Sequence, residues 1–227
     1  MWNPLPLSLA PHGVHADAEG AIWIADAYQH TVLKYSYNGS FLLSIGAPYV
    51  PALAHFGEPF NMPTGVATTP DGEVFVSDGY GNARIHRFDK TCRLVSSWGS
   101  RGDEVGMFAV PHFIEYDQDA DTLWVCDREN DRIQIFTREG AFVGVINGFI
   151  YPNDVAFYDD IVAIAHKAGV SIIDRRSHEV ICDWGHDDPY PGATRHPHGI
   201  FIDKTGNIYT TEAFGGHQTT KFQRVPV

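Results

Sequence analysis

The chain has 227 residues, and 28 acidic side chains against 16 lysines and arginines give it a formal net charge of −12. This balance argues against an extended nucleic-acid surface, because affinity for a polyanion depends on lysines and arginines that neutralise phosphates. Charged residues make up 19% of the chain and aromatic residues 13%, a composition that excludes a largely disordered protein.

The cysteines and the N-terminal residues bear on the compartment. Cys92, Cys126 and Cys182 are widely spaced, so neither a disulfide framework nor a cysteine-based zinc site is predicted. Residues 1–10 lack the basic start and apolar core of a signal peptide, and no apolar run approaches the roughly 18 residues of a membrane span. We therefore expect a cytoplasmic protein without a membrane contact, or a secreted one if the chain is a fragment of a longer precursor.

Five segments of the chain resemble one another, and they begin at Pro11, Pro63, Pro111, Pro152 and Pro197. In the second, PTGVATTPDGEVFVSDGYGNARIHRFDKTCRLVSSWG, we predict strands over residues 65–68, 73–77, 83–88 and 94–98, separated by turn sequences such as Pro-Asp-Gly. Four short antiparallel strands in a repeat of about 45 residues are typical of a propeller blade. The repeats predict an all-β chain in which residues 1–227 form a single β-propeller domain.

The residue after the first proline of each repeat is informative, because equivalent positions of successive blades surround one axis. It is His12, Thr64, His112, Asn153 and His198 in repeats one to five. In a six-bladed ring, histidines of alternate blades would lie about 120° apart and converge, which matches a catalytic zinc site with an open fourth position. Imidazole also suits Cu, Fe and Ni. The alternative is that these histidines lie at the top of their blades and bond to neighbouring carbonyls.

A second equivalent position ends the second predicted strand of each repeat, and its residues are Asp26, Asp78, Asp127, His166 and Glu212. Aspartates at such places usually accept hydrogen bonds from backbone amides of the following turn. We expect this structural role for the three aspartates. The alternative is that they orient metal-bound histidines.

Tyr80 and Arg128 follow Asp78 and Asp127 closely and are predicted on loops at one mouth of the ring. A tyrosine beside a metal can act as a general base once its pKa is lowered. An arginine there can bind a carboxylate through two parallel hydrogen bonds. The alternative for Arg128 is an ion pair with Glu129 or Asp131.

The repeats resemble the NHL type, most clearly in SDGYGNARIHRF and CDRENDRIQIF. The chain is also similar to the peptidyl-α-hydroxyglycine α-amidating lyase (peptidylamidoglycolate lyase) family of six-bladed NHL propellers. This similarity is carried by LAPHGVHADAEGAIWIADAYQHTVLKY, VSDGYGNARIHRF, FAVPHFIEYDQDADTLWVCDRENDRIQIF and HPHGIFIDKTGNIY. The resemblance implies zinc on His12, His112 and His198, with Tyr80 as the catalytic tyrosine and Arg128 as an active-site arginine.

The implied reaction is a step of peptide amidation. A zinc-dependent lyase would cleave the N–C bond of a (peptidyl-)α-hydroxyglycine, giving a primary amide and glyoxylate. The substrate would be a small molecule or peptide with a carbinolamide and a carboxylate. Zinc would stabilise the hydroxyl oxygen as an alkoxide, Tyr80 would take the hydroxyl proton, and Arg128 would hold the carboxylate.

The chain departs from this family in length and in one metal site. Six blades need roughly 280 residues, whereas five repeats are recognisable here, so we expect an incomplete or open six-bladed arc, with a five-bladed ring as the alternative. The family also has another active-site arginine one blade before the first histidine. Its calcium site uses an aspartate where this chain has Gly199, which makes Ca²⁺ a weaker expectation than Zn²⁺.

Two other functions are compatible with a propeller. One is a calcium-dependent lactonase or esterase of the gluconolactonase-like type, which Asn153 and Asp154 together with Asp78 resemble. Three histidines suit calcium poorly, since that ion prefers oxygen ligands. The other is a non-catalytic NHL interaction module, which has no need of histidines in alternate blades. Metal analysis separates these functions, and the sequence predicts no particular oligomeric state.

Overall fold

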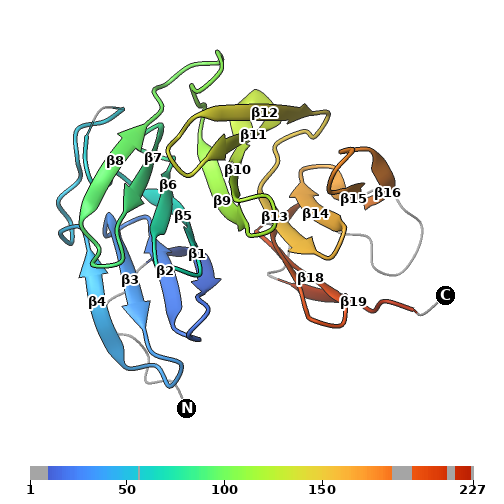
Figure 1. Cartoon of the computed structure of the whole chain (residues 1–227), viewed down its shortest axis with the longest axis horizontal. Coiled ribbons are helices and arrows are strands. Elements are labelled where there is room, and N and C mark those ends of the chain that lie inside the picture. Colours follow the sequence, from blue (N-terminus) through green and yellow to red (C-terminus); the bar gives the residue numbers. More distant parts are fainter. Residues whose placement is uncertain (1–9, 56, 186–195, 214–217, 226–227) are drawn as a thin grey trace. The chain divides into compact units, whose positions relative to one another are not determined.

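The computed structural model describes residues 10–55, 57–185, 196–213 and 218–225. Across these residues the chain consists of short β-strands and one 3-10 turn, η1 (Arg128–Asn130), without an α-helix (Figure 1). No helix of the described residues is therefore long and apolar enough to cross a membrane. The all-β class predicted from the repeats is confirmed.

The chain divides into two compact units. The first comprises Met1–Asn130 and Gln134–Gly144, and the second comprises Asp131–Ile133 and Val145–Val227. The division falls within the outer strands of the third repeat. The expectation of a single domain over residues 1–227 stays a prediction.

The first three blades are four-stranded antiparallel sheets, each made from consecutive strands, and all but residues 132–133 and 145–147 of the third belong to the first unit. The first sheet consists of β1 (Pro11–Ala16), β2 (Ile22–Asp26), β3 (Thr31–Tyr35) and β4 (Phe41–Ile45). The second consists of β5 (Pro63–Thr68), β6 (Val74–Asp78), β7 (Arg84–Phe88) and β8 (Leu94–Trp98). The third consists of β9 (Pro111–Asp117), β10 (Thr122–Asp127), β11 (Arg132–Thr137) and β12 (Phe142–Asn147).

The second unit holds the remaining two sheets. One consists of β13 (Asp154–Tyr158), β14 (Ile161–His166), β15 (Gly169–Asp174) and β16 (Val180–Gly185), and the other of β17 (Pro197–Ile202), β18 (Ile208–Glu212) and β19 (Thr219–Phe222). Every sheet follows chain order, which is the arrangement of a propeller blade. The five repeats are therefore five blades, as predicted, and their first strands start at the repeat proline in four blades and two residues after it in the fourth.

The hydrophobic core lies between successive blades, because each middle strand is covered on both faces. In the first unit, one cluster joins the first two blades through side chains that include Trp23, Phe60 and Phe88. A second cluster joins the second and third blades and includes Phe75, Phe108, Leu123 and Phe136. The second unit has a cluster of its own, with Val170, Ile200 and Ile208. Full burial of one such side chain stabilises the fold by about 1.5–3 kcal/mol.

His15 links the inner strands of the first two blades. Its Nε2 lies 2.8 Å from the Thr68 hydroxyl oxygen. Burial lowers the pKa of His15 to about 4, although the charge of Asp17 opposes the shift. The folded protein therefore keeps this imidazole neutral at a pH where the unfolded chain, with a pKa of about 6.5, already binds a proton.

His15 therefore predicts a loss of stability in mild acid. The unfolded chain binds more protons between pH 6.5 and 4, so the free energy of unfolding falls as the pH falls through this window. At about 1.4 kcal/mol per pH unit, the loss from this group reaches about 3 kcal/mol near pH 4. Denaturant unfolding of wild type and His15→Gln at several pH values measures it. The variant should gain stability relative to wild type as the pH falls, and a constant difference contradicts the prediction.

Candidate active site

His12 and His112 stand at irregular positions of their inner strands. In β1 the register with β2 shifts between Pro11 and Gly13, so that His12 is the extra residue of a β-bulge. In β9 the register with β10 shifts in the same way around His112. A bulge re-aims its extra side chain away from the regular ladder, which is how an inner strand can present an imidazole at its end.

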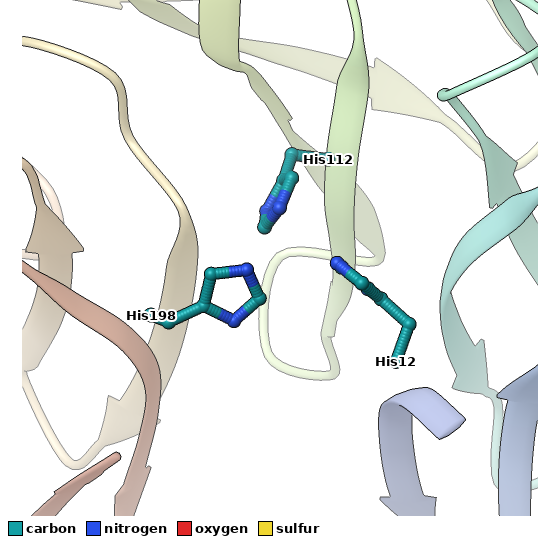
Figure 2. Close-up of side chains that lie close together, drawn as sticks. All are labelled: His12, His112 and His198. Atoms are coloured by element: carbon teal, nitrogen blue, oxygen red, sulfur yellow. The ribbon is translucent and has the colours of Figure 1, made fainter. Parts of the chain in front are cut away.

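The two histidines of the first unit meet at the hydroxyl group of Tyr80. Their ring centroids are 4.7 Å apart, and Figure 2 shows the two imidazoles. The Tyr80 hydroxyl oxygen lies 2.8 Å from Nε2 of His12 and 3.0 Å from Nε2 of His112. One phenolic oxygen therefore bridges two imidazole nitrogens, each of which could bind a metal.

A backbone carbonyl fixes the tautomer of His12. Its Nδ1 donates to the carbonyl oxygen of Thr64 at 2.6 Å, so the lone pair is on Nε2, the nitrogen next to Tyr80. Burial lowers the pKa of His12, the Thr64 carbonyl opposes this shift, and the charge of Arg128 adds to the lowering. A neutral imidazole held by such a carbonyl is the form that ligates metals. The bond to a neighbouring carbonyl, which the alternative for these histidines expected, is therefore present for His12, but it occupies only Nδ1.

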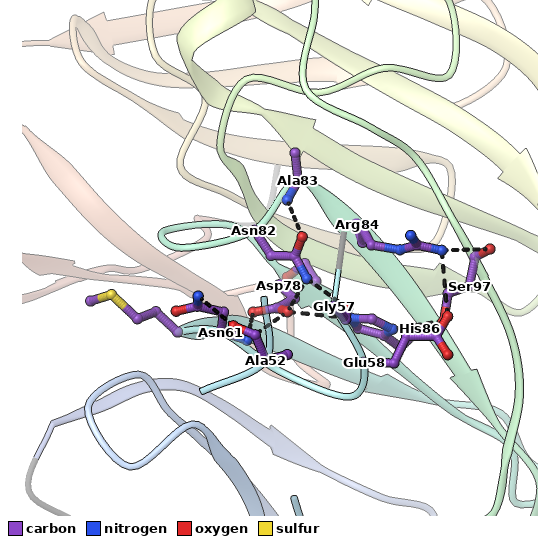
Figure 3. A network of polar contacts seen from close by, with 12 residues as sticks. Ala52, Gly57, Glu58, Asn61, Asp78, Asn82, Ala83, Arg84, His86 and Ser97 are labelled. Carbon is purple, nitrogen blue, oxygen red and sulfur yellow. Dashed lines mark hydrogen bonds and ion pairs between the residues drawn. The ribbon is translucent and has the colours of Figure 1, made fainter. Parts of the chain in front are cut away.

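The loop that carries Tyr80 is held by a buried polar network around Asp78 (Figure 3). The Asp78 carboxylate accepts the backbone N–H of Asn61 at 2.8 and 3.0 Å and the Asn82 side-chain amide at 2.9 Å. Nε2 of His86 lies 3.3 Å from the same carboxylate. Asn61 in turn accepts the backbone N–H of Gly81. The network therefore fixes the backbone on both sides of Tyr80.

Two glycines let the Tyr80 loop approach its neighbours closely. A Cβ atom at Gly79 would overlap the Pro111 carbonyl oxygen, and one at Gly81 would overlap the Asn61 side chain. Gly79 therefore sits against the residue that precedes His112. This close approach helps to explain how Tyr80 reaches that imidazole.

Arg128 begins η1 and lies beside Tyr80. Its Nη1 is 3.5 Å from the Tyr80 hydroxyl oxygen, and its guanidinium carbon lies 5.5 Å from the Tyr80 ring centroid. Its Nε and Nη2 donate to the Glu129 carboxylate at 3.2 and 2.9 Å. The alternative ion pair with Glu129 is therefore present, together with the contact to Tyr80.

The pKa of Tyr80 moves in the opposite direction to the one expected from the sequence. Burial raises it, the charge of Arg128 and its hydrogen bond lower it, and Glu129 raises it again. The net shift of the pKa is upward because burial disfavours the tyrosinate more strongly than Arg128 favours it. The charge of Arg128 is offset in part by its ion pair with Glu129. A cation bound to the imidazoles would act in the direction that the sequence analysis expected.

His198 occupies the same bulged position in the second unit, where the register of β17 with β18 shifts between Pro197 and Gly199. The side chain of Asn153 donates to the Pro197 carbonyl oxygen at 2.9 Å. In the first unit the Thr64 hydroxyl donates to the Pro111 carbonyl oxygen at 2.7 Å. In both units, a blade that lacks histidine at the bulged position thus holds the backbone of the next blade, immediately before the histidine that occupies the bulged position there.

The aspartates of the second equivalent position have a structural role, although only one of them binds the turn that was expected. Asp26 accepts the backbone N–H of Gln29, Asp78 that of Asn61, and Asp127 that of Ala109. At the same position, His166 lies 2.9 Å from the Ser171 hydroxyl oxygen. The expected bond to the following turn is confirmed for Asp26, whereas Asp78 and Asp127 bind backbone amides of the segment that precedes their blade, 17 and 18 residues earlier in the chain.

Comparison with known proteins agrees with the blade architecture. The NHL repeat matches residues 60–88 and 108–136, which belong to the second and third blades. Virginiamycin B lyase from Staphylococcus aureus superposes with a TM-score of 0.65 at 16% identity, over 94% of this chain and 70% of that chain. At this identity the similarity shows the fold alone. The second and third blades thus match the NHL repeat, and the fold is of the β-propeller type.

Its sequence relatives are named for amidation. The probable peptidyl-alpha-hydroxyglycine alpha-amidating lyase pgal-1 of Caenorhabditis elegans is 36% identical over 132 residues, which are 56% of this chain and 37% of the relative. Peptidyl-alpha-hydroxyglycine alpha-amidating lyase 2 of Drosophila melanogaster is 29% identical over 231 residues, 93% of this chain and 54% of the relative. The chain is a homologue of these proteins and spans between about a third and about half of their length.

Proposed function

We propose that the protein is a zinc-dependent lyase that cleaves the N–C bond of an α-hydroxyglycine-type carbinolamide to a primary amide and glyoxylate. The observation that carries the proposal is the position of the Tyr80 hydroxyl, within 3.0 Å of Nε2 of both His12 and His112. The names of the relatives support the same chemistry.

The donor set fits zinc. His12 and His112 of the first unit both present Nε2 at the Tyr80 hydroxyl, and His198, at the same bulged position of the second unit, is the third ligand that we propose. Three imidazoles with an open position are typical of catalytic zinc, and the carbonyl bond of His12 supplies the outer support that such ligands usually have. Bound zinc would act as a Lewis acid that stabilises negative charge on the substrate oxygen.

Tyr80 is the residue placed to move the proton. As the tyrosinate, the form that a cation at the imidazoles would favour, its phenolic oxygen would take the proton from the substrate hydroxyl, and that carbon–oxygen bond would become the aldehyde of glyoxylate. The C–N bond breaks with its electron pair moving to nitrogen, and the proton returns to that nitrogen as the primary amide forms. Proton transfer by a positioned side chain is typically worth 10²–10⁴ in rate.

Arg128 is placed to bind the carboxylate of the substrate. Its Nε and Nη2 are engaged by Glu129, whereas Nη1 is directed to Tyr80. The substrate carboxylate therefore meets the Nη1 side of the guanidinium, next to the group that receives the proton. Glu129 keeps the guanidinium plane in place for this contact.

Metal analysis and a product assay together test the proposal. Purified protein should carry about one zinc per chain, since the three ligands hold a single ion, and should release glyoxylate from an N-acyl-α-hydroxyglycine. A chelator should stop the release, and added zinc should restore it. Zinc-loaded protein that releases no glyoxylate would overturn the proposal. Calcium as the only bound metal, with lactone hydrolysis, would favour the lactonase alternative.

A further inference from the structure

A pocket opens beside Tyr80 in the first unit. Its volume is about 400 Å³, and its walls include Tyr80, Ala83, Phe108, Val110, His55 and Arg101. It also borders Glu129, the neighbour of Arg128 in the chain. We call it the Arg101 pocket. This volume lies within the range of small-molecule sites, which is roughly 300–1,000 Å³.

The charge of Arg101 is uncompensated. Its Nη1 donates to Nε2 of His55 at 3.3 Å, and it forms no ion pair with a carboxylate of the described residues. Arg128, in contrast, is paired with Glu129 at 2.9 Å. Arg101 and Arg128 both lie near Tyr80. Of the two, Arg101 is therefore the one whose guanidinium can pair with an anionic ligand without first leaving a carboxylate.

His55 adds a second polar group to the same wall. Because its Nε2 accepts from Arg101, its Nδ1 carries the proton. This Nδ1 is buried and has no hydrogen-bond partner among the described residues. Leaving a buried donor unpaired costs about 1–3 kcal/mol, and a bound acceptor would remove that cost.

Part of the pocket lining is apolar. Phe108 is completely buried, and Ala83, Ala109 and Val110 line the pocket with it. Arg101 and Phe108 are also joined by a backbone bridge between their segments, which ties the cationic and apolar parts together. A short aliphatic chain that ends in an anion matches this combination of surfaces.

We infer that the Arg101 pocket binds the acyl part of the substrate and selects a short aliphatic chain ending in a carboxylate, such as an aspartyl, glutamyl or dicarboxylic acyl group. This inference rests on the proposed function, because it places the scissile amide at Tyr80. The carboxylate of the hydroxyglycine then faces Arg128 while the acyl carboxylate faces Arg101.

Two pairs of ligands with equal carbon number test the inference. N-glutarylglycine and N-pentanoylglycine lack the hydroxyl group and cannot be cleaved, so calorimetry measures their binding without turnover. Wild type should bind the glutaryl compound about fivefold to tenfold more tightly, since it gains one charge-assisted contact at a partly exposed site. The corresponding α-hydroxyglycines should show the same ratio in kcat/KM.

Variants of two arginines assign the preference. Arg101→Met should bind both glycines equally and keep wild-type affinity for the pentanoyl compound. Arg93 is an exposed arginine of the same unit that pairs with Asp89, and Arg93→Met should keep the full preference. Equal binding by wild type, a preference that survives in Arg101→Met, or failure of both glycines to bind would overturn the inference.

The two assays separate this inference from the proposed function. If the binding preference depends on Arg101 but neither hydroxyglycine yields glyoxylate, the result supports acyl binding in the Arg101 pocket and overturns the lyase proposal. If both hydroxyglycines yield glyoxylate at equal kcat/KM and both glycines bind equally, the result supports the lyase proposal and overturns the selectivity that we assign to the Arg101 pocket.

Discussion

Tyr80→Phe is expected to retain zinc and to lose lyase activity, with kcat reduced by about 10²–10⁴. The substitution removes one oxygen atom, the one that lies 2.8 Å from His12 Nε2 and 3.0 Å from His112 Nε2. The aromatic ring keeps its place beside Arg128, so substrate binding and KM should change little. Steady-state glyoxylate release, with zinc content measured on the same sample, checks the prediction.

Tyr28 offers a matched control for this substitution. It lies two residues after Asp26, as Tyr80 lies two residues after Asp78, and its side chain is exposed. Tyr28→Phe should leave both kcat and zinc content unchanged. Wild-type activity in Tyr80→Phe would rule out the proton-transfer role.

His112→Ala is expected to lose both bound zinc and lyase activity. Removing even an outer hydrogen-bond partner of a ligand typically costs 10–100-fold in metal affinity, and removing a ligand itself should cost at least about a hundredfold. Zinc competition with a chromophoric chelator measures the affinity. The imidazole of His112 is almost completely buried, so the variant also leaves a cavity, and its fold needs an independent check by circular dichroism.

His15→Gln is the control for His112→Ala. His15 is another partly buried histidine of the first unit, and its Nε2 lies 2.8 Å from the Thr68 hydroxyl oxygen. This variant should bind zinc with wild-type affinity at neutral pH. A folded His112→Ala protein that keeps wild-type zinc affinity would contradict the assignment of His112 as a ligand.

The blades were predictable because they follow from local patterns. Strands expected over residues 65–68, 73–77, 83–88 and 94–98 appear as β5 to β8 with differences of two residues or fewer at their ends. Repetition strengthens each pattern, since a turn sequence in one blade is supported by its counterpart in the next. The start of β5 at Pro63 was missed because the bulge at Thr64 interrupts the regular alternation.

The details of the site depended on contacts that no spacing encodes. The repeat positions brought His12, His112, Tyr80 and Arg128 forward as candidates. The bridging position of the Tyr80 hydroxyl depends on the close approach of Gly79 to Pro111, and the upward pKa shift of Tyr80 depends on burial. The Arg101 pocket was not predicted either, because Arg101 and His55 lie 46 residues apart and in irregular loops.

The bulge at the start of the inner strands gives this fold a replaceable position. On either side of the extra residue the ladder of hydrogen bonds continues, so the identity of that residue has little influence on the pairing of the strands. The same position holds histidine in β1 and threonine in β5. One position of the blade can therefore carry either a reactive or a structural side chain without a change of strand pairing, which is one route by which related propellers acquire, lose or alter a chemistry while their blades stay the same.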